Sequence, residues 1–179
     1  PEKYEVLVRR YQERLQRFAL GMVGDRDAAA DLVQESLVKA YTSLYACRNP
    51  SRFGSWVHQI VRNACRDFLK NVRRAHEPLE DHPGLVSAIP GPAAELDRGE
   101  ARRTLRGALA ALPDEHREAF LLKHLEGYSY PEIAEMVRAS VSAVKMRVHR
   151  SREMLRSKLE SRAGRGSDVT IAPARSSSQ

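Results

Sequence analysis

The sequence contains few of the patterns on which catalytic and metal-binding proteins depend. It has two cysteines, Cys47 and Cys65, and neither lies in a CxxC pair or in a Cys/His spacing suited to zinc. The six histidines are scattered, and no glycine-rich phosphate loop occurs. We therefore expect no catalytic residue, no metal site and no cofactor, with both thiols reduced and mostly buried.

Long hydrophobic runs are also missing. No apolar stretch approaches the roughly 20 residues needed to span a bilayer, and the N-terminus is charged from Glu2 onward, unlike a signal peptide. Hydrophobic residues make up 42% of the chain and charged residues 30%, which favours a globular chain over a wholly disordered one. These features predict a cytoplasmic protein with no membrane span.

The charge is distributed in blocks. The net charge is +7, with +6 on residues 1–74, −5 on residues 75–100 and +6 on residues 101–179. Basic surfaces attract polyanions, of which nucleic acid is the most common. Solubility alone would also explain two basic blocks, so composition leaves both interpretations open.

Apolar residues recur with helical spacing, and no period-two alternation typical of strands is visible. Three amphipathic stripes occupy the N-terminal part, at residues 4–22, 29–44 and 53–68. Gly24-Asp25 and Asn49-Pro50 separate them. We expect three helices that bury these stripes against one another.

The predicted fold class is all-α, with two small helical domains joined by a flexible linker. Residues 1–74 form the first domain, and the Pro- and acid-rich residues 75–100 form the linker. Residues 101–160 resume the helical spacing and form the second domain. The Gly- and Ser-rich tail, 161–179, is expected to be disordered.

A helix-turn-helix is predicted in the second domain. Ser129 and Glu132 have the spacing of a capping box at the start of a short helix, and Ser140 can cap the next one. Residues 139–158 include six basic residues and one acid, a composition suited to insertion into the DNA major groove. A plain helical hairpin with a solvated basic face is the alternative.

Several of these motifs together resemble bacterial sigma factors. Residues 111–120, 126–135 and 144–152 resemble the fourth conserved region of that family. Residues 31–36 and the segment from Phe53 to Asp67 resemble its second region. A chain with these two regions and a linker is similar to the extracytoplasmic-function (ECF) class, and the resemblance covers about residues 4–160.

The resemblance implies three contact surfaces. The surface for core RNA polymerase would consist of Asp31, Gln34 and Glu35. The surface for the minus-ten promoter element would consist of Arg62, Asn63, Arg66, Lys70, Arg73 and Arg74. The surface for the minus-thirty-five element would consist of Ser140, Ser142, Ala143, Lys145, Met146, Arg147, His149 and Arg150. The segment 47–52 would capture a base flipped from the opening duplex.

Two positions depart from the family pattern. Arg138 stands in the turn of the helix-turn-helix, where the family usually has glycine. Ser142-Ala143 stands where Gly-Thr often precedes the Val-Lys pair. A positive φ is costly for most residues other than glycine, so the turn geometry and the promoter preference are the features most affected.

The resemblance predicts a sigma factor whose partners are core RNA polymerase, promoter DNA and an anti-sigma factor. The acidic linker would either mimic nucleic acid near the polymerase active site or act as a spacer. Two other functions are consistent with parts of the sequence. A stand-alone dimeric helix-turn-helix regulator would leave the N-terminal motifs unexplained, and a nucleic-acid enzyme would need an acid or metal cluster.

Overall fold

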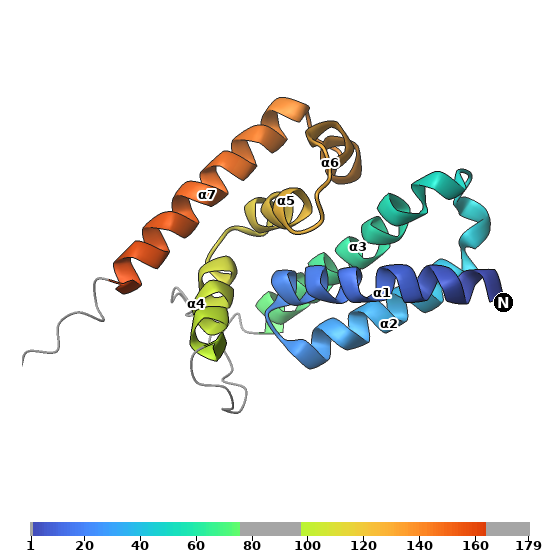
Figure 1. Ribbon diagram of the computed structural model, residues 1–179, viewed down its shortest axis with the longest axis horizontal. Helices are drawn as coiled ribbons and strands as arrows, with labels where there is room; N and C mark the ends of the chain where they lie inside the picture. The colour runs from blue at the N-terminus through green and yellow to red at the C-terminus, as the bar shows by residue number, and fades with distance from the viewer. Residues whose placement is uncertain (1, 76–97, 164–179) are drawn as a thin grey trace, which may run out of the picture.

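The computed structural model describes residues 2–75 and 98–163, which form helices and contain no strand. The predicted linker, from residue 76 to 97, and the predicted tail, from residue 164 on, lie outside the described residues. The elements in chain order are α1 Glu2–Val23, α2 Arg26–Thr42, η1 Leu44–Ala46, η2 Pro50–Arg52, α3 Phe53–Ala75, α4 Arg98–Ala110, α5 Asp114–His124, α6 Tyr130–Val137 and α7 Val141–Ala163 (Figure 1).

Helices α1, α2 and α3 form the N-terminal block. Their predicted apolar stripes meet in its centre, where Phe18, Val33 and Val57 are buried. Asp25 separates α1 from α2 by capping α2, because its side chain accepts a hydrogen bond from the Ala28 N–H at 2.7 Å. The three-helix packing predicted from the spacing is therefore present.

Helices α4 to α7 form the C-terminal block, and α4 begins at Arg98, earlier than the predicted domain start at 101. Pro113 precedes the first residue of α5, as its fixed φ favours. Val144 and Val148 of α7 are buried in the core that α7 shares with α5.

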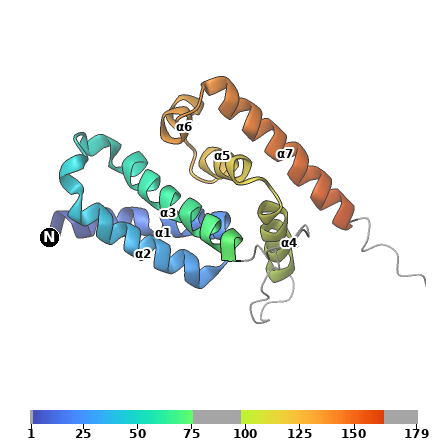
Figure 2. The same ribbon diagram turned by 180° about the vertical axis from the view of Figure 1, so that it is seen from behind.

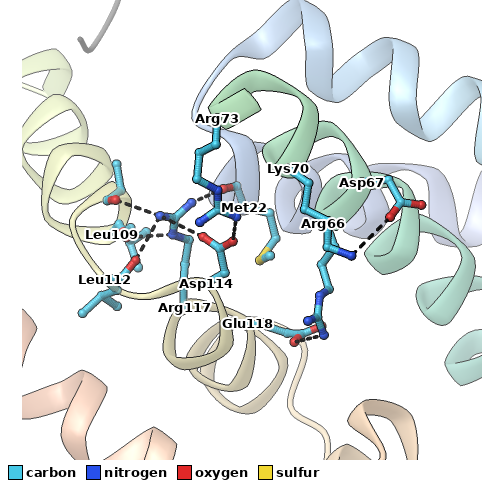
Figure 3. A network of polar contacts seen from close by, with 11 residues as sticks. Met22, Arg66, Asp67, Lys70, Arg73, Leu109, Leu112, Asp114, Arg117 and Glu118 are labelled. Carbon is cyan, nitrogen blue, oxygen red and sulfur yellow. Dashed lines mark hydrogen bonds and ion pairs between the residues drawn. The ribbon is translucent and has the colours of Figure 1, made fainter. Parts of the chain in front are cut away.

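One side chain, that of Arg117, fixes the corner between α4 and α5. The guanidinium of Arg117 donates to the carbonyl oxygens at the end of α4, those of Leu109, Ala110 and Leu112. It also donates to the carbonyl of Met22 at the end of α1 (Figure 3). Arg117 therefore ties the two blocks together as well as closing its own corner.

The two blocks pack against each other, although the sequence predicted two domains joined by a flexible linker. Figures 1 and 2 both show α5 between α7 and the three N-terminal helices, and one buried apolar cluster continues from the first block into the second. Gly21 of α1 allows this approach, because a Cβ there would lie 2.9 Å from the methyl carbons of Leu121 in α5. The described residues thus form a closed arrangement with a shared core.

Candidate nucleic-acid interface

The predicted minus-ten residues divide into two stripes on α3. At 3.6 residues per turn, residues 62, 66 and 73 fall within about 40° of one another, and residues 63, 70 and 74 form a second set about 100° away. We call Arg62, Arg66 and Arg73 the inner stripe, and Asn63, Lys70 and Arg74 the outer stripe. The six residues therefore do not form one surface, since the inner stripe faces the C-terminal block.

Each arginine of the inner stripe forms an ion pair with an acid of α5. Arg62 pairs with Glu118, and Arg66 lies 3.9 Å from the same carboxylate. Arg73 pairs with Asp114 at the first turn of α5 (Figure 3). The outer stripe remains exposed to solvent, with Asn63 accepting a hydrogen bond from Arg62 at 3.3 Å.

The Arg62–Glu118 pair is enclosed between the blocks, with side chains 9% and 1% exposed. Burial raises the pKa of Glu118, and the charges of Arg62 and Arg66 oppose that rise. Burial also raises the pKa of the neighbouring Cys65 thiol to about 12, with a further contribution from the Glu118 charge. The Glu118 carboxylate depends on its arginine partners, since an unpaired buried charge is strongly unfavourable.

The helix-turn-helix has the caps that the sequence predicted. Ser129 and Glu132 form a capping box at the start of α6, and the Ser140 hydroxyl accepts from the Ala143 N–H at 3.1 Å at the start of α7. Arg138 adopts the left-handed conformation between the two helices, with φ 53° and ψ 51°. The turn therefore keeps the geometry that normally favours glycine, although it carries an arginine.

The recognition face of α7 is largely open to solvent. The exposed predicted contacts are Ser140, Ser142, Lys145, Met146, His149 and Arg150. Ala143 and Arg147 are half-buried, and Arg147 pairs with Glu115 of α5 at 2.6 Å. His149 lies 3.5 Å from Glu153 one turn later. Most of this predicted DNA surface is thus accessible in the closed arrangement.

The predicted polymerase-binding residues lie together on α2. Asp31, Gln34 and Glu35 are all exposed, as expected from their spacing. Gln34 also lines an apolar hollow of about 510 Å³ between α1 and α2, beside Val38 and Tyr41. The face of α2 therefore combines acids with exposed apolar side chains and lies away from α5.

The segment predicted to capture a flipped base is held by local caps and by one contact from the C-terminal block. Asn49 caps η2 by accepting from the Ser51 N–H at 3.0 Å. Arg52 pairs with Glu135 of α6 at 2.6 Å, and both side chains are largely exposed. This second part of the predicted minus-ten surface also contacts the helix-turn-helix.

A buried polar cluster that the sequence did not indicate lies between the blocks. Glu126, just after α5, is fully buried, with one carboxylate oxygen 3.0 Å from His58 Nε2 and 3.1 Å from Arg14 Nε. The Tyr128 hydroxyl lies 3.1 Å from His58 Nδ1, and burial raises the Tyr128 pKa to about 12. These residues are far apart in the sequence, so no local spacing indicated the cluster.

No group of three or more His, Cys, Asp or Glu side chains in the described residues could hold a metal ion. None of the described helices is both long and apolar enough to cross a membrane.

Both blocks match regions of one known protein family. Residues 7–75 match the family described as Sigma-70 region 2, and residues 102–155 match Sigma-70, region 4. The chain is 31% identical over 166 residues to the ECF RNA polymerase sigma-E factor of Haemophilus influenzae, covering 88% of this chain and 87% of that protein. It is 33% identical over 142 residues to the ECF RNA polymerase sigma factor EcfG of Rhodopseudomonas palustris, with 79% and 76% covered.

Solved structures share this fold. The structure of CnrH in complex with the cytosolic domain of CnrY has a TM-score of 0.67 at 27% identity, covering 88% of each chain. The sigma factor RpoE in complex with the anti-sigma factor NepR from Bartonella quintana has a TM-score of 0.70 at 24% identity. That comparison covers 89% of this chain and 98% of RpoE, and it supports the fold.

Proposed function

The chain belongs to the ECF class of the sigma-70 family, and we propose that it binds bacterial core RNA polymerase and directs transcription from specific promoters. The observation that carries this function is the presence of region 2 and region 4 in one chain. Its partners are then core polymerase and promoter DNA, and its role is regulation of transcription. Because initiation takes place where RNA polymerase works, the proposal places its action in the bacterial cytoplasm.

Each of the three surfaces has its own partner in the proposal. In the proposal, the α2 face with Asp31, Gln34 and Glu35 docks on the polymerase, and carboxylates there give orientation against a basic partner. The α3 stripes read and hold the minus-ten element, with Asn63 able to hydrogen-bond a base edge. The α7 face places Lys145 and Arg150 at the minus-thirty-five element, where basic residues hold phosphates.

Polymerase would make two weak DNA contacts act as one. Each block alone offers a small surface, and binding both to one scaffold raises the effective concentration of the second contact. A stand-alone helix-turn-helix regulator would instead bind its site tightly without polymerase. A gel-shift assay with the pure protein separates these two possibilities.

Control by an anti-sigma factor is part of the proposal. It is supported by the similarity, at 27% identity, to the structure of CnrH in complex with the cytosolic domain of CnrY, and the fold is shared with RpoE of Bartonella quintana, which was solved with the anti-sigma factor NepR. The exposed apolar side chains along the α2 hollow, Val38 and Tyr41, would be suited to such a partner, which would then compete with polymerase.

The function is tested by in-vitro transcription with bacterial core polymerase, the full chain and a pool of genomic fragments as template. We expect discrete transcripts that require the chain and that are lost with Lys145→Glu or Asn63→Ala. The matched controls are Lys158→Glu on α7 and Asn71→Ala on α3, which change the same residue types outside the proposed surfaces. If no transcripts appear and the chain also fails to bind core polymerase, the proposal is wrong.

A further inference from the structure

Tyr45 in η1 is an aromatic side chain that the fold leaves uncovered. It is 87% exposed, more than any other large hydrophobic side chain among the described residues. The rings of Tyr41, Phe53 and Trp56 in the same block all contact other rings. The Tyr45 ring contacts none within the described residues, and its hydroxyl has no hydrogen-bond partner there. This ring therefore contributes little to folding and is available to a partner.

The backbone holds Tyr45 in a fixed place although its ring is uncovered. The Cys47 N–H donates to the Leu44 carbonyl oxygen at 3.0 Å, across the turn that contains Tyr45. The Arg48 N–H donates to the Ala46 carbonyl oxygen at 3.0 Å, so the chain turns back directly after η1. A tyrosine on a fixed backbone has few torsions left to order, so binding through its ring has a small entropic cost.

The segment around this ring is basic. Between Glu35 and Asp67 the chain contains no Asp or Glu, and it contains five Lys and Arg residues. One of these, Arg52, is paired with Glu135 of α6. Another, Arg48, is exposed and forms no ion pair within the described residues. This distribution of charge favours a polyanionic partner.

An uncovered aromatic ring beside an unpaired cation is suited to a nucleic-acid strand whose bases are unpaired. Every unpaired base has a flat face that stacks on an aromatic ring, and its phosphate attracts a neighbouring cation. The bases of an intact duplex are stacked on one another and offer no such face. An apolar groove of a protein would also accept Tyr45, but it would give Arg48 no anionic partner.

The position of Tyr45 in the chain indicates which unpaired base it would meet. The segment predicted to capture a flipped base, 47–52, begins two residues later. Flipping a base out of a strand takes a stacking partner away from its neighbour, which costs free energy. A ring fixed beside the capturing segment can take the place of the lost partner.

We infer that Tyr45 is a stacking platform for an unpaired base of the opened promoter strand, next to the base that segment 47–52 captures. The inference rests on the proposed function, because it assumes that the N-terminal block holds an opened promoter. Tyr45 then acts only after the strands have separated, and Arg48 attracts the phosphate beside the stacked base. The ring stabilises the open complex without changing the affinity for core polymerase or for paired DNA.

The test uses the full chain bound to core polymerase and a promoter recovered from the transcription assay. Two fluorescein-labelled forms of this promoter are compared in the cold by anisotropy, one fully paired and one with an unpaired minus-ten region. Tyr45→Leu keeps an apolar side chain without a ring and should bind the unpaired form about tenfold more weakly, with less than about twofold change on the paired form. Tyr45→Phe keeps the ring and should bind both forms as the native chain does.

The stacked base is located by removing single bases from the unpaired strand, one position at a time. At the position that stacks on Tyr45, loss of the base should weaken native binding about tenfold but should weaken Tyr45→Leu by less than about twofold, because the partner is already missing. Val6→Ala, which shortens another exposed apolar side chain of the same block, is the control and should bind both promoter forms as the native chain does.

The inference is overturned if Tyr45→Leu binds the unpaired form as tightly as the native chain, if it loses as much on the paired form, or if no base position couples to it. Weaker binding of Tyr45→Leu to core polymerase would also overturn it, because a protein would then be the partner of the ring. In each of these cases, transcripts from the native chain leave the proposed function standing. A native chain that gives no transcripts and does not bind core polymerase overturns both.

Discussion

The Nε2 atom of His58 lies 3.0 Å from a carboxylate oxygen of Glu126, and both side chains are fully buried. The two residues come from different blocks, and the other ring nitrogen, Nδ1, lies 2.9 Å from the Gly54 carbonyl oxygen. Arg14 donates to the Glu126 carboxylate and, at 2.8 Å, to the Glu126 carbonyl. This cluster adds a buried polar centre to the interface between the blocks, beside the ion pairs of α3 with α5.

Replacing Glu126 should destabilise the closed arrangement. Glu126→Ala removes the shared acceptor of His58 and Arg14 and should lower the free energy of unfolding by about 2 kcal/mol, less than a wholly buried pair would lose because Arg14 is partly exposed. Urea unfolding followed by circular dichroism measures the change. Glu160→Ala, which removes an exposed acid of α7, is the control and should change stability by less than about 0.5 kcal/mol. Equal effects of the two substitutions would contradict the role given to Glu126.

Arg138→Gly should stabilise the protein. Arg138 holds φ at 53°, and this left-handed conformation costs an ordinary residue about 1 kcal/mol that glycine does not lose. We expect a gain of about 0.5–1 kcal/mol in thermal or urea unfolding. Ala139→Gly, at the next position and without a positive φ, should give a loss. A loss of stability in Arg138→Gly as well would show that the arginine side chain outweighs its backbone.

The capping box of α6 should make stability depend on acid. The Ser129 hydroxyl and backbone N–H both donate to Glu132, at 2.6 and 2.8 Å, and these hydrogen bonds lower the pKa of Glu132. A carboxyl whose pKa is lowered on folding contributes stability above its ordinary pKa, and this contribution disappears as the pH falls through the lowered value. Ser129→Ala should cost about 1 kcal/mol at neutral pH and reduce the acid dependence. Unfolding curves measured between pH 7 and 3 would test this, and an unchanged acid dependence in Ser129→Ala would refute it.

The two thiols should differ in reactivity. Cys65 is buried with a pKa of about 12, whereas Cys47 is half-buried near η1. A thiol reagent at pH 8 should therefore modify Cys47 alone in the folded chain, because the thiolate is the nucleophile. Cys47→Ser should then show no rapid reaction until denaturant is added. Rapid modification of both thiols would mean that the α3–α5 interface opens readily.

The raised pKa of Cys65 should also make the protein less stable at alkaline pH. The unfolded thiol has an ordinary pKa of 9.0, so between that value and about 12 the folded chain binds a proton that the unfolded chain has lost. Stability should fall as the pH rises through this window, and Cys65→Ala should remove that part of the alkaline dependence. Thermal unfolding between pH 8 and 10.5 measures it, and an identical slope in both proteins would count against the burial of Cys65.

Local features of the fold could be predicted from the sequence. The helix spacing, the Ser129–Glu132 capping box, the Ser140 cap and the buried Val144 and Val148 all depend on residues within a few positions of one another. The unusual backbone conformation at Arg138 could also be predicted, because the family pattern has a glycine in this turn. Periodicity and capping act over one or two helical turns, and a single sequence contains that information.

The packing of the blocks could not be predicted in this way. Arg62 was expected on the surface for the minus-ten element, yet it is buried against Glu118, because helical spacing gives the angle of a side chain but not the element that covers it. Nothing in the sequence around Glu118, Glu126 or His58 distinguishes them from other acids and histidines of the chain. The partners in these contacts are separated by 56 and 68 residues, and no local rule joins positions so distant.

Arg117 contacts both blocks, but unequally. Of its four carbonyl acceptors, the three at the end of α4 belong to its own block, and only the Met22 carbonyl lies across the interface. The α4–α5 corner would therefore travel as a rigid body when the blocks separate. The carbonyl left behind is at the end of α1, where water can reach it, so no polar group is stranded. Breaking and re-forming this one contact would therefore need no change inside either block.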